Sequence, residues 1–446
     1  MRKRVFYFIS LILFCISSNA KSQDFYALNN HGDTIYYNIT SSTAPYIVEV
    51  TYKGNTPLQF LNEYSDTLDI PISAVYNDTT YIVKSIRDSA FCECGRLKCI
   101  TIGDSITSIA RNAFNGCIRL SLVNFNAVNC GDLETFIPLF ENCISLTAVN
   151  VGNNVNRIPG YAFWSSDIRT INFGNSVREI GNNAFQYCPN LTSVTIPGSV
   201  NHLARFAFAD CVGIVSVSFE EGFEILNDGV FQNCTSISSI SLPNSLLRVG
   251  GFNNCRSLTS VEIPNSVTSF GYYAFDNCIN LKSITIPSGV TFIGNGAFES
   301  CTGLDSIISK PINPIPVADF VFWGVNKSIP IYVPCESLSL YQNAPEWDRF
   351  TNYRCLLDVT NIDNNNMISC SLYPNPTEKE TKLEIEGLTD DADIFVLDLN
   401  GRILKTYKYS LDQKQLIIDV SGFAKGIYSI KVNSSNFNTV KKIVVN

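Results

Sequence analysis

The amino-acid sequence predicts a mainly β repeat solenoid, with a parallel sheet and short helical turns, followed by a small antiparallel β-sandwich of immunoglobulin-like type. The first observation is a unit of 23 residues, 272–294, that recurs along most of residues 85–334. Self-similarity at this period indicates about 10 to 11 stacked coils, because one unit alone buries too little apolar surface to fold. The second observation is the alternation of apolar and polar residues after residue 370, with Asn-Gly and Lys-Gly turns, which is typical of a sandwich.

Residues 1–22 have the layout of a secretory signal peptide. Three basic residues precede an apolar run from Val5 to Ile16, and cleavage is expected after Ala20 or Ser22. The run is shorter than the roughly 20 residues that a membrane-spanning helix needs. We therefore expect an exported chain with no membrane-spanning segment in its mature part. The net charge of −8 argues against nucleic acid as a partner.

Residues 23–84 precede the repeats and are predicted to form a β cap over the open end of the stack. Segments such as DTIYYNI and YIVEVTYKG are rich in Tyr, Thr, Ile and Val between turn residues, which indicates short strands. Without such a cap, the first coil would expose apolar core and an unpaired sheet edge.

Residues 85–334 contain the repeats. In most units an Ala-Phe step comes first, a Cys follows three residues later, and a strand-like LxxVxI segment leads to a turn such as IPNSV. Strands of this kind at this period mark a leucine-rich solenoid. The Phe positions are Phe91, Phe114, Phe140, Phe163, Phe185, Phe208, Phe231, Phe252, Phe275 and Phe298. The Cys positions are Cys94, Cys117, Cys143, Cys188, Cys211, Cys234, Cys255, Cys278 and Cys301, with Ser166 as the substitute.

Two irregular segments interrupt the pattern. The coil between Phe114 and Phe140 is three residues longer than the unit, which predicts a loop over residues 126–138. The segment Phe320–Trp323 belongs to a last, proline-rich coil. Irregular loops on a rigid scaffold often carry specificity, so both segments are secondary candidates for binding.

Residues 335–357 are predicted to cap the second end of the solenoid. The segment CESLSLYQNAPEWDRF has the pattern of a short amphipathic helix with Leu338, Tyr341 and Trp347 on its apolar face. An Asn- and Asp-rich linker, residues 358–370, leads from this cap to the last domain.

The repeat signature AFxxCxxLxxVxIPxSV resembles that of the BspA-like leucine-rich repeat family of bacterial surface proteins, over roughly residues 60–355. The last domain, residues 371–446, carries YPNP, DLNGR, DVS, GIY and KKI in this order. These motifs include Pro374, Asn375, Pro376, Asp398, Gly401, Arg402, Gly426, Tyr428 and Lys442. They resemble the type A sorting domain of the type IX secretion system. The resemblance implies export by that machinery to the outer surface of a Gram-negative bacterium, or release from it, with removal of the sorting domain.

No pattern in the chain points to catalysis, to a metal site or to a cofactor. His31 and His202 have no second imidazole near them in the sequence, and HExxH, GxSxG and GxxxxGK motifs do not occur. Acidic pairs such as Glu220-Glu221 are adjacent, which favours a solvated turn over the two carboxylates of a glycosidase. We therefore expect a protein that is not an enzyme.

The chain has 16 cysteines, nine of which share one repeat position. We expect these nine to form a buried column of reduced thiols that pack between coils. Neighbouring coils are close enough for disulfides, but side chains with one shared direction bond poorly, and Ser166 shows that the column tolerates a residue without a thiol. Cys335 and Cys355 bracket the predicted cap helix and are candidates for a disulfide.

One polar position of the strands forms the candidate binding face. It carries hydroxyl and amide side chains, with almost no charge and no aromatic ring. One interpretation is an extended recognition surface, as repeat proteins commonly offer. The other is a side-chain hydrogen-bond ladder that keeps the parallel sheet in register. The positions are Thr101, Asn124, Asn150, Asn172, Thr195, Ser218, Ser241, Glu262 and Thr285.

Two functions fit these patterns. The first is a secreted or surface-exposed protein that adheres to a host or bacterial surface protein or to a glycan. The second is a structural spacer or coat protein with no dedicated ligand.

Overall fold

The computed structural model describes residues 22–445 except 60–62, 132–138, 319, 357–368, 374, 376, 387–389, 399–401, 414 and 435–437. The predicted signal peptide, all but its last residue, and most of the predicted linker therefore lie outside the described residues. The chain forms two compact units, residues 1–354 and residues 355–446, and each is described by itself.

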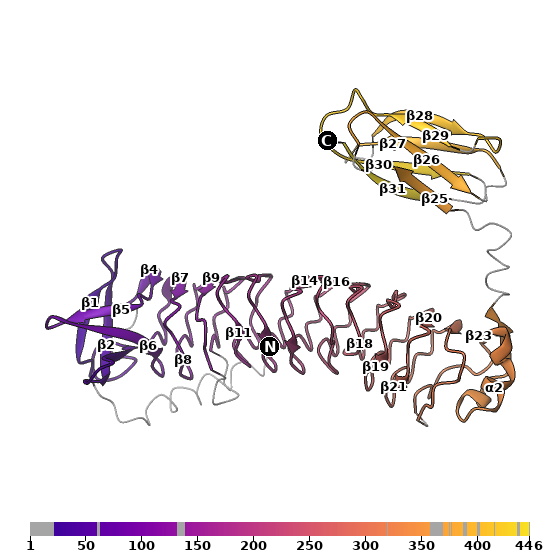
Figure 1. The fold of residues 1–446 in the computed structure, drawn as a ribbon. Coiled ribbons are helices and arrows are strands. Elements are labelled where there is room, and N and C mark those ends of the chain that lie inside the picture. The colour runs from indigo at the N-terminus through magenta and orange to yellow at the C-terminus, as the bar shows by residue number, and fades with distance from the viewer. Residues whose placement is uncertain are drawn as a thin grey trace. The chain divides into compact units, whose positions relative to one another are not determined.

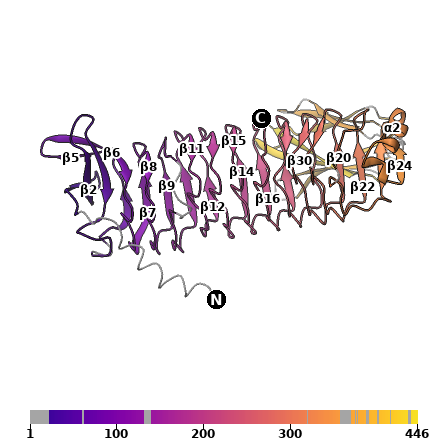
Figure 2. The ribbon, with the colours of Figure 1, turned by 90° about the horizontal axis from the view of Figure 1, so that it is seen from below.

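The first unit begins with a six-stranded sheet of mixed direction (Figures 1 and 2). Its strands are β1 (Phe25–Leu28), β2 (Thr34–Ser41), β3 (Ile47–Thr51), β5 (Ser73–Tyr76), β6 (Thr79–Ile86) and β8 (Ser108–Ile109). The hairpins alternate buried and exposed side chains, as with Ile35 and Tyr37 in β2, because one face covers the core. β6 pairs in parallel with β8 of the next coil, so this sheet continues directly into the repeats.

Strands of two to seven residues then recur in most coils on two sides of a flattened solenoid. The longer side contains β4 (Ser65–Asp69), β7 (Arg96–Ile102), β9 (Leu122–Phe125), β10 (Ala148–Val151), β12 (Thr170–Asn172), β14 (Ser193–Ile196), β16 (Ser216–Phe219), β17 (Ser239–Ser241), β20 (Ser283–Ile286), β22 (Ser306–Ser309) and β23 (Pro330–Val333). The shorter side contains β11 (Arg157–Ile158), β13 (Glu179–Ile180), β15 (His202–Leu203), β18 (Arg248–Val249), β19 (Ser269–Phe270) and β21 (Phe292–Ile293).

The core of the solenoid is built from columns of like residues. The predicted Phe column is completely buried, and successive rings stack with centroids 4.9 to 6.0 Å apart. Phe322 extends this column by one coil beyond the ten predicted positions. The structure confirms the predicted solenoid, with tight turns and almost no helix between its strands.

The C-terminal cap is less helical than predicted. Helix α2 covers only Leu338–Asn343, between the single turns η2 (Cys335–Ser337) and η3 (Trp347–Arg349), and strand β24 (Asn352–Cys355) follows. The helix ends because Ala344 is extended, as a residue before proline must usually be. Tyr341 and Trp347 are nevertheless fully buried, as the apolar face requires, whereas Leu338 is only partly buried.

The second unit consists of two antiparallel sheets with their own hydrophobic core, which agrees with the predicted sandwich. One sheet has the order β25-β26-β29 and the other the order β28-β27-β30-β31. The strands are β25 (Ser369–Tyr373), β26 (Glu380–Glu386), β27 (Ala392–Leu397), β28 (Ile403–Tyr409), β29 (Leu416–Asp419), β30 (Gly426–Asn433) and β31 (Asn438–Val445). In the part of the chain that the structure describes, no helix is long and apolar enough to cross a lipid bilayer.

Candidate functional site

The first part of the predicted binding face is a hydrogen-bonded ladder. Strands β7, β9, β10 and β12 pair in register, so that Thr101, Asn124, Asn150 and Asn172 lie side by side. Each amide then donates to the residue one coil earlier: Asn124 to Thr101 over 3.3 Å, Asn150 to Asn124 over 2.9 Å and Asn172 to Asn150 over 2.8 Å. The amide groups are therefore largely engaged with one another.

The second part of the face is less engaged. Thr195, Ser218 and Ser241 are paired in register on β14, β16 and β17. A hydroxyl–hydroxyl bond of 2.8 Å joins Thr195 to Ser218, but Ser241 makes no side-chain hydrogen bond with any described residue. Hydroxyls from Ser241 onwards are therefore available to a partner.

The last part of the face changes character. Glu262 lies in a segment without a strand, so the sheet is interrupted at its coil. Thr285 on β20 pairs with Ile308 on β22, and Ile308 with Tyr332 on β23, so the polar column ends in two half-buried apolar side chains. The predicted polar column therefore ends at Thr285, where it was expected to end, but it is interrupted at Glu262.

The long coil leaves a hollow of about 310 Å³ beside the first part of the face. Ile72, Asp104, Asn126 and Asn153 are among the residues that line it. Of the predicted loop over residues 126–138, only the first six residues are described, so the tip of the loop lies outside the described residues.

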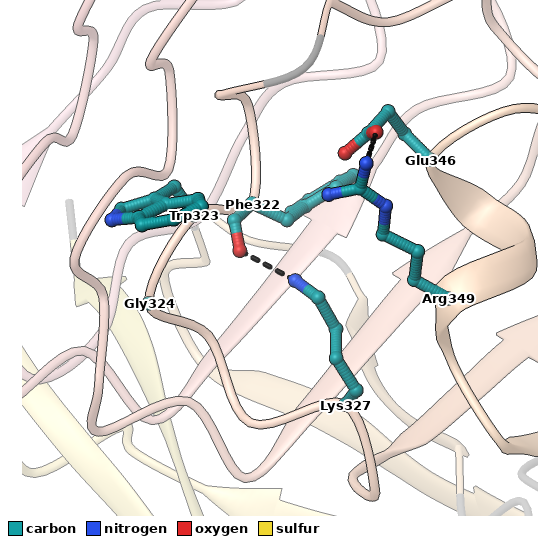
Figure 3. Close-up of a pocket in the computed structure, with 6 residues that line it drawn as sticks. All are labelled: Phe322, Trp323, Gly324, Lys327, Glu346 and Arg349. Atoms are coloured by element: carbon teal, nitrogen blue, oxygen red, sulfur yellow. Dashed lines mark hydrogen bonds and ion pairs between the residues drawn. The ribbon is translucent and has the colours of Figure 1, made fainter.

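A second pocket, of about 360 Å³, lies at the C-terminal end of the solenoid, at the predicted segment Phe320–Trp323 (Figure 3). Phe322 points inward as the last ring of the Phe column, whereas Trp323 is 57% exposed and stands at one side of the pocket. Gly324 follows with a φ of +78°, a left-handed conformation that suits glycine. The sharp turn thus exposes the indole.

Three charged side chains face Trp323 across this pocket. Glu346 is only 8% exposed and forms an ion pair of 2.7 Å with Arg349 from the same cap segment. The Lys327 ammonium donates to the carbonyl oxygen of Phe322 over 2.5 Å and lies 4.7 Å from the centre of the Phe350 ring. The pKa of Lys327 is lowered to about 8, mainly by burial, with the nearby Glu346 opposing this shift and Arg349 adding to it.

Sequence reasoning missed Lys327, Glu346 and Arg349. Two of them flank Trp347, which was identified only as an apolar cap residue. The available signal was their charge, since charged residues make up only 16% of the chain and these three lie within the short segment that closes the solenoid.

The thiol column is buried and chemically quiet. From Cys117 onwards, each thiol of the column donates to the carbonyl oxygen of the Phe in the preceding coil, over distances from 3.0 Å at Cys301 to 3.5 Å at Cys255. The coil of Ser166 has no thiol at this position. Burial raises the pKa values of six of these thiols, that of Cys301 to about 12, so these six are poor nucleophiles. The six are Cys117, Cys188, Cys234, Cys255, Cys278 and Cys301. All cysteines of the column are free, whereas Cys335 and Cys355 are each disulfide-bonded.

In the second unit, the structure places part of the predicted sorting motif on the last strand. Asn375 donates to the carbonyl oxygen of Lys442 over 2.7 Å and accepts from the amide of Val444 over 2.9 Å, which fastens the first motif to β31. Asp398 accepts from the amide of Arg402 over 2.9 Å.

Other motif residues are less informative. Tyr428 donates to the carbonyl oxygen of Ala424 over 2.8 Å, beside Gly426 at the start of β30. Pro374, Pro376 and Gly401 lie outside the described residues. Nδ1 of His31 lies 3.0 Å from a carboxylate oxygen of Asp69, and Nδ1 of His202 lies 3.4 Å from one of Glu179. Among the described residues, no three His, Cys, Asp or Glu side chains gather in a way that could hold a metal ion.

Comparisons with known families agree with this architecture. The model described as "BspA type Leucine rich repeat region" matches in 6 copies, over residues 72–192, 161–251 and 247–373, which is more than half of the chain. The model described as "Secretion system C-terminal sorting domain" matches residues 371–446. The resemblances seen in the sequence are thereby confirmed.

One solved structure in particular supports the leucine-rich repeat fold, and a second is less similar. A leucine-rich repeat protein of Bacteroides ovatus is 24% identical, with a TM-score of 0.50, over 72% of this chain and 86% of that protein. A leucine-rich cell surface protein of Faecalibacterium prausnitzii is 21% identical, with a TM-score of 0.28, over 65% of this chain and 95% of that protein. No curated protein is similar enough to match the chain.

Proposed function

Because the chain belongs to the BspA-type leucine-rich repeat family and ends in a secretion system sorting domain, we propose that it is a non-enzymatic binding protein of the bacterial cell surface. The type IX machinery exports it to the outside of a Gram-negative bacterium, where the solenoid adheres to a host or bacterial surface protein or to a glycan. The alternative, a spacer or coat without a ligand, needs the same export route but no specific surface.

One observation favours binding over a spacer: the polar strand face is only partly used for its own stability. From Thr101 to Asn172 the side chains bond one another, which is what a structural ladder requires. From Ser241 to Thr285 the side chains, two hydroxyls and the Glu262 carboxylate, make no such bonds with described residues, so their hydrogen-bonding groups are available to a partner. This second segment is therefore the candidate for contact with a partner.

The test compares the two segments on the whole exported protein. We expect the double variant Ser241→Lys and Thr285→Lys to abolish adhesion to a panel of immobilised matrix proteins and glycans, because two ammonium groups would disrupt a neutral interface. Lys310→Gln, an exposed change away from the face, is the matched control. If the unsubstituted protein binds nothing on a broad panel, or if the double variant binds as well as it does, the spacer interpretation is preferred.

A further inference from the structure

The pocket beside Trp323 combines three features that suit the binding of a small ligand. It is large enough for a small ligand, since ligand pockets begin at about 300 Å³ and this one measures about 360 Å³. An indole ring, 57% exposed, stands on one side of the pocket. A half-buried cation, Lys327, stands on the other, without a carboxylate at ion-pair distance among the described residues.

The charges of the pocket favour an anion. Glu346 is already paired with Arg349, so Lys327 leaves the pocket with a net positive charge on a chain whose total is −8. An ammonium removed from water without a counter-ion costs free energy, and a bound carboxylate would recover it through a charge-assisted hydrogen bond. Arg349 uses one Nη on Glu346 and keeps further N–H groups for the same anion.

The exposed indole favours a sugar ring. The face of an indole carries partial negative charge, and the slightly positive C–H bonds on one face of a pyranose pack against it. Lys327 and Arg349 supply donors and Glu346 supplies an acceptor, which together suit a ring with hydroxyl groups and a carboxylate. A peptide would instead use its main chain along a strand edge. The pocket is lined by turns and cap residues, and no strand contributes to its lining.

We propose that this pocket binds an acidic sugar, a uronic or sialic acid unit of a surface glycan, with the sugar ring on Trp323 and the carboxylate between Lys327 and Arg349. The proposal deepens the proposed function, on which it rests, by giving the chemical class of one ligand. It places that ligand at the C-terminal end of the solenoid rather than on the strand face.

The experiment is titration calorimetry of the full chain with three oligosaccharides. The two acidic probes are a tetrasaccharide of alternating glucuronate and N-acetylglucosamine, and sialyllactose, which distinguish the two sources of the carboxylate. Chitotetraose is the neutral probe. We expect at least one acidic probe to bind, more weakly at high salt because the contact is ionic, and chitotetraose to bind at least about tenfold more weakly.

Two variants and two controls locate the binding. Trp323→Ala and Lys327→Gln should each weaken binding of the acidic probe by about tenfold or more. The matched controls, Tyr187→Ala for an exposed aromatic residue and Lys310→Gln for an exposed cation, should change it by less than about twofold. Arg349 is left in place, because its removal would leave the buried Glu346 carboxylate without its ion-pair partner.

Each of the other outcomes contradicts either the pocket proposal or the strand-face proposal. Equal binding of chitotetraose would contradict anion recognition, and variants that bind like the unsubstituted chain would contradict this location. A short peptide acid that binds more tightly than either sugar, and loses binding in Trp323→Ala, would make the pocket a peptide site. If no acidic sugar binds but the chain still adheres to the panel of surface molecules, the pocket proposal fails while the proposed function stands. If the acidic sugar binds but the chain adheres to no molecule of the panel, only the strand-face proposal fails.

Discussion

At the scale of single residues, the recurring cysteine is explained by a hydrogen bond as well as by size. The carbonyl oxygen of Phe91 accepts from the amide of Cys94 in its own turn and from the thiol of Cys117 in the next coil. The thiol thus occupies the second lone pair of a buried carbonyl while its sulfur fills the space between coils. This double role accounts for the preference for cysteine over other small residues.

The single exception gives the first prediction. Ser166 is 4% exposed, and its hydroxyl has no hydrogen-bond partner. A buried polar group without a partner costs about 1–3 kcal/mol. We therefore expect Ser166→Cys to raise the free energy of unfolding by ~1 kcal/mol in a urea titration, because the thiol is larger, less polar and able to reach the Phe140 carbonyl. Ser260→Cys, an exposed change, is the control and should be neutral. A loss of stability in Ser166→Cys would show that the shape of this coil, not its hydroxyl, excludes the thiol.

The second prediction concerns alkaline pH. Burial raises the pKa of the Cys278 thiol well above its ordinary value, whereas in the unfolded chain a thiol ionises near ~8.5. Above that pH the unfolded chain binds fewer protons than the folded one, so stability falls as pH rises. Each thiol whose pKa burial raises in this way contributes a loss of up to ~1.4 kcal/mol per pH unit, which for Cys301 continues to its folded pKa of about 12.

The measurement is the free energy of unfolding in urea at several values from about pH 8 to about pH 10. Cys278→Ala should show a shallower decline than the unsubstituted chain, by up to ~1.4 kcal/mol per pH unit. The slope is the readout, so the destabilisation that the substitution causes at every pH does not affect the comparison. Identical slopes would mean that Cys278 is not protected from ionisation in the folded state.

At the scale of elements, the C-terminal cap depends on one side chain. Trp347 is completely buried, donates from its indole nitrogen to the carbonyl oxygen of Ile315 over 2.9 Å, and packs edge-on against Phe322 at 5.0 Å. It thereby closes the last ring of the Phe column and the end of the core. The turn η3 and helix α2 contribute little regular structure of their own, so the cap is held by packing.

The third prediction follows from this packing. Trp347→Ala should lower the free energy of unfolding by about 3–5 kcal/mol, the usual cost of removing a buried aromatic ring. Trp323→Ala is the matched control, since the same change at an exposed tryptophan should cost less than about 0.5 kcal/mol. Thermal unfolding of both variants, with hydrogen exchange to follow the last coils, checks the difference. Equal effects of the two variants would contradict a central role for Trp347.

The elements also show what sequence could and could not predict. Phe, Cys and strand columns follow from periodicity, because each coil must bury the same positions against its neighbours. The predicted cap helix is too long because the apolar pattern was given more weight than Pro345, which indicates that a helix ends near Ala344. The pocket could not be predicted, because Lys327 and Arg349 are brought together by the irregular last coil. Periodicity also does not show which polar side chains of the strand face bond one another, because this depends on strand register. Asn150 bonds its neighbours, whereas Ser241 does not bond any described residue.

At the scale of the whole molecule, the chain consists of two units that have separate hydrophobic cores. Residues from Phe25 to Phe350 make up the first core and residues from Leu383 to Val445 the second. Two units with separate cores are expected to fold independently. The first unit matches the leucine-rich repeat model and the second matches the sorting-domain model. Binding and export should therefore be separable by truncation.

The fourth prediction is that deletion of residues 371–446 blocks export without harming the solenoid. The truncated chain should accumulate in the periplasm, because it keeps the predicted signal peptide but lacks the sorting domain. Its solenoid should melt at the same temperature as in the full chain, since no residue of the first core has been removed. Surface labelling and cell fractionation test the first expectation, and calorimetry of the purified protein tests the second. A fusion of residues 371–446 to an unrelated periplasmic protein is the converse control and should reach the cell surface. Normal surface display of the truncated chain would contradict the sorting role, whereas a lowered melting temperature would contradict only the independence of the two units.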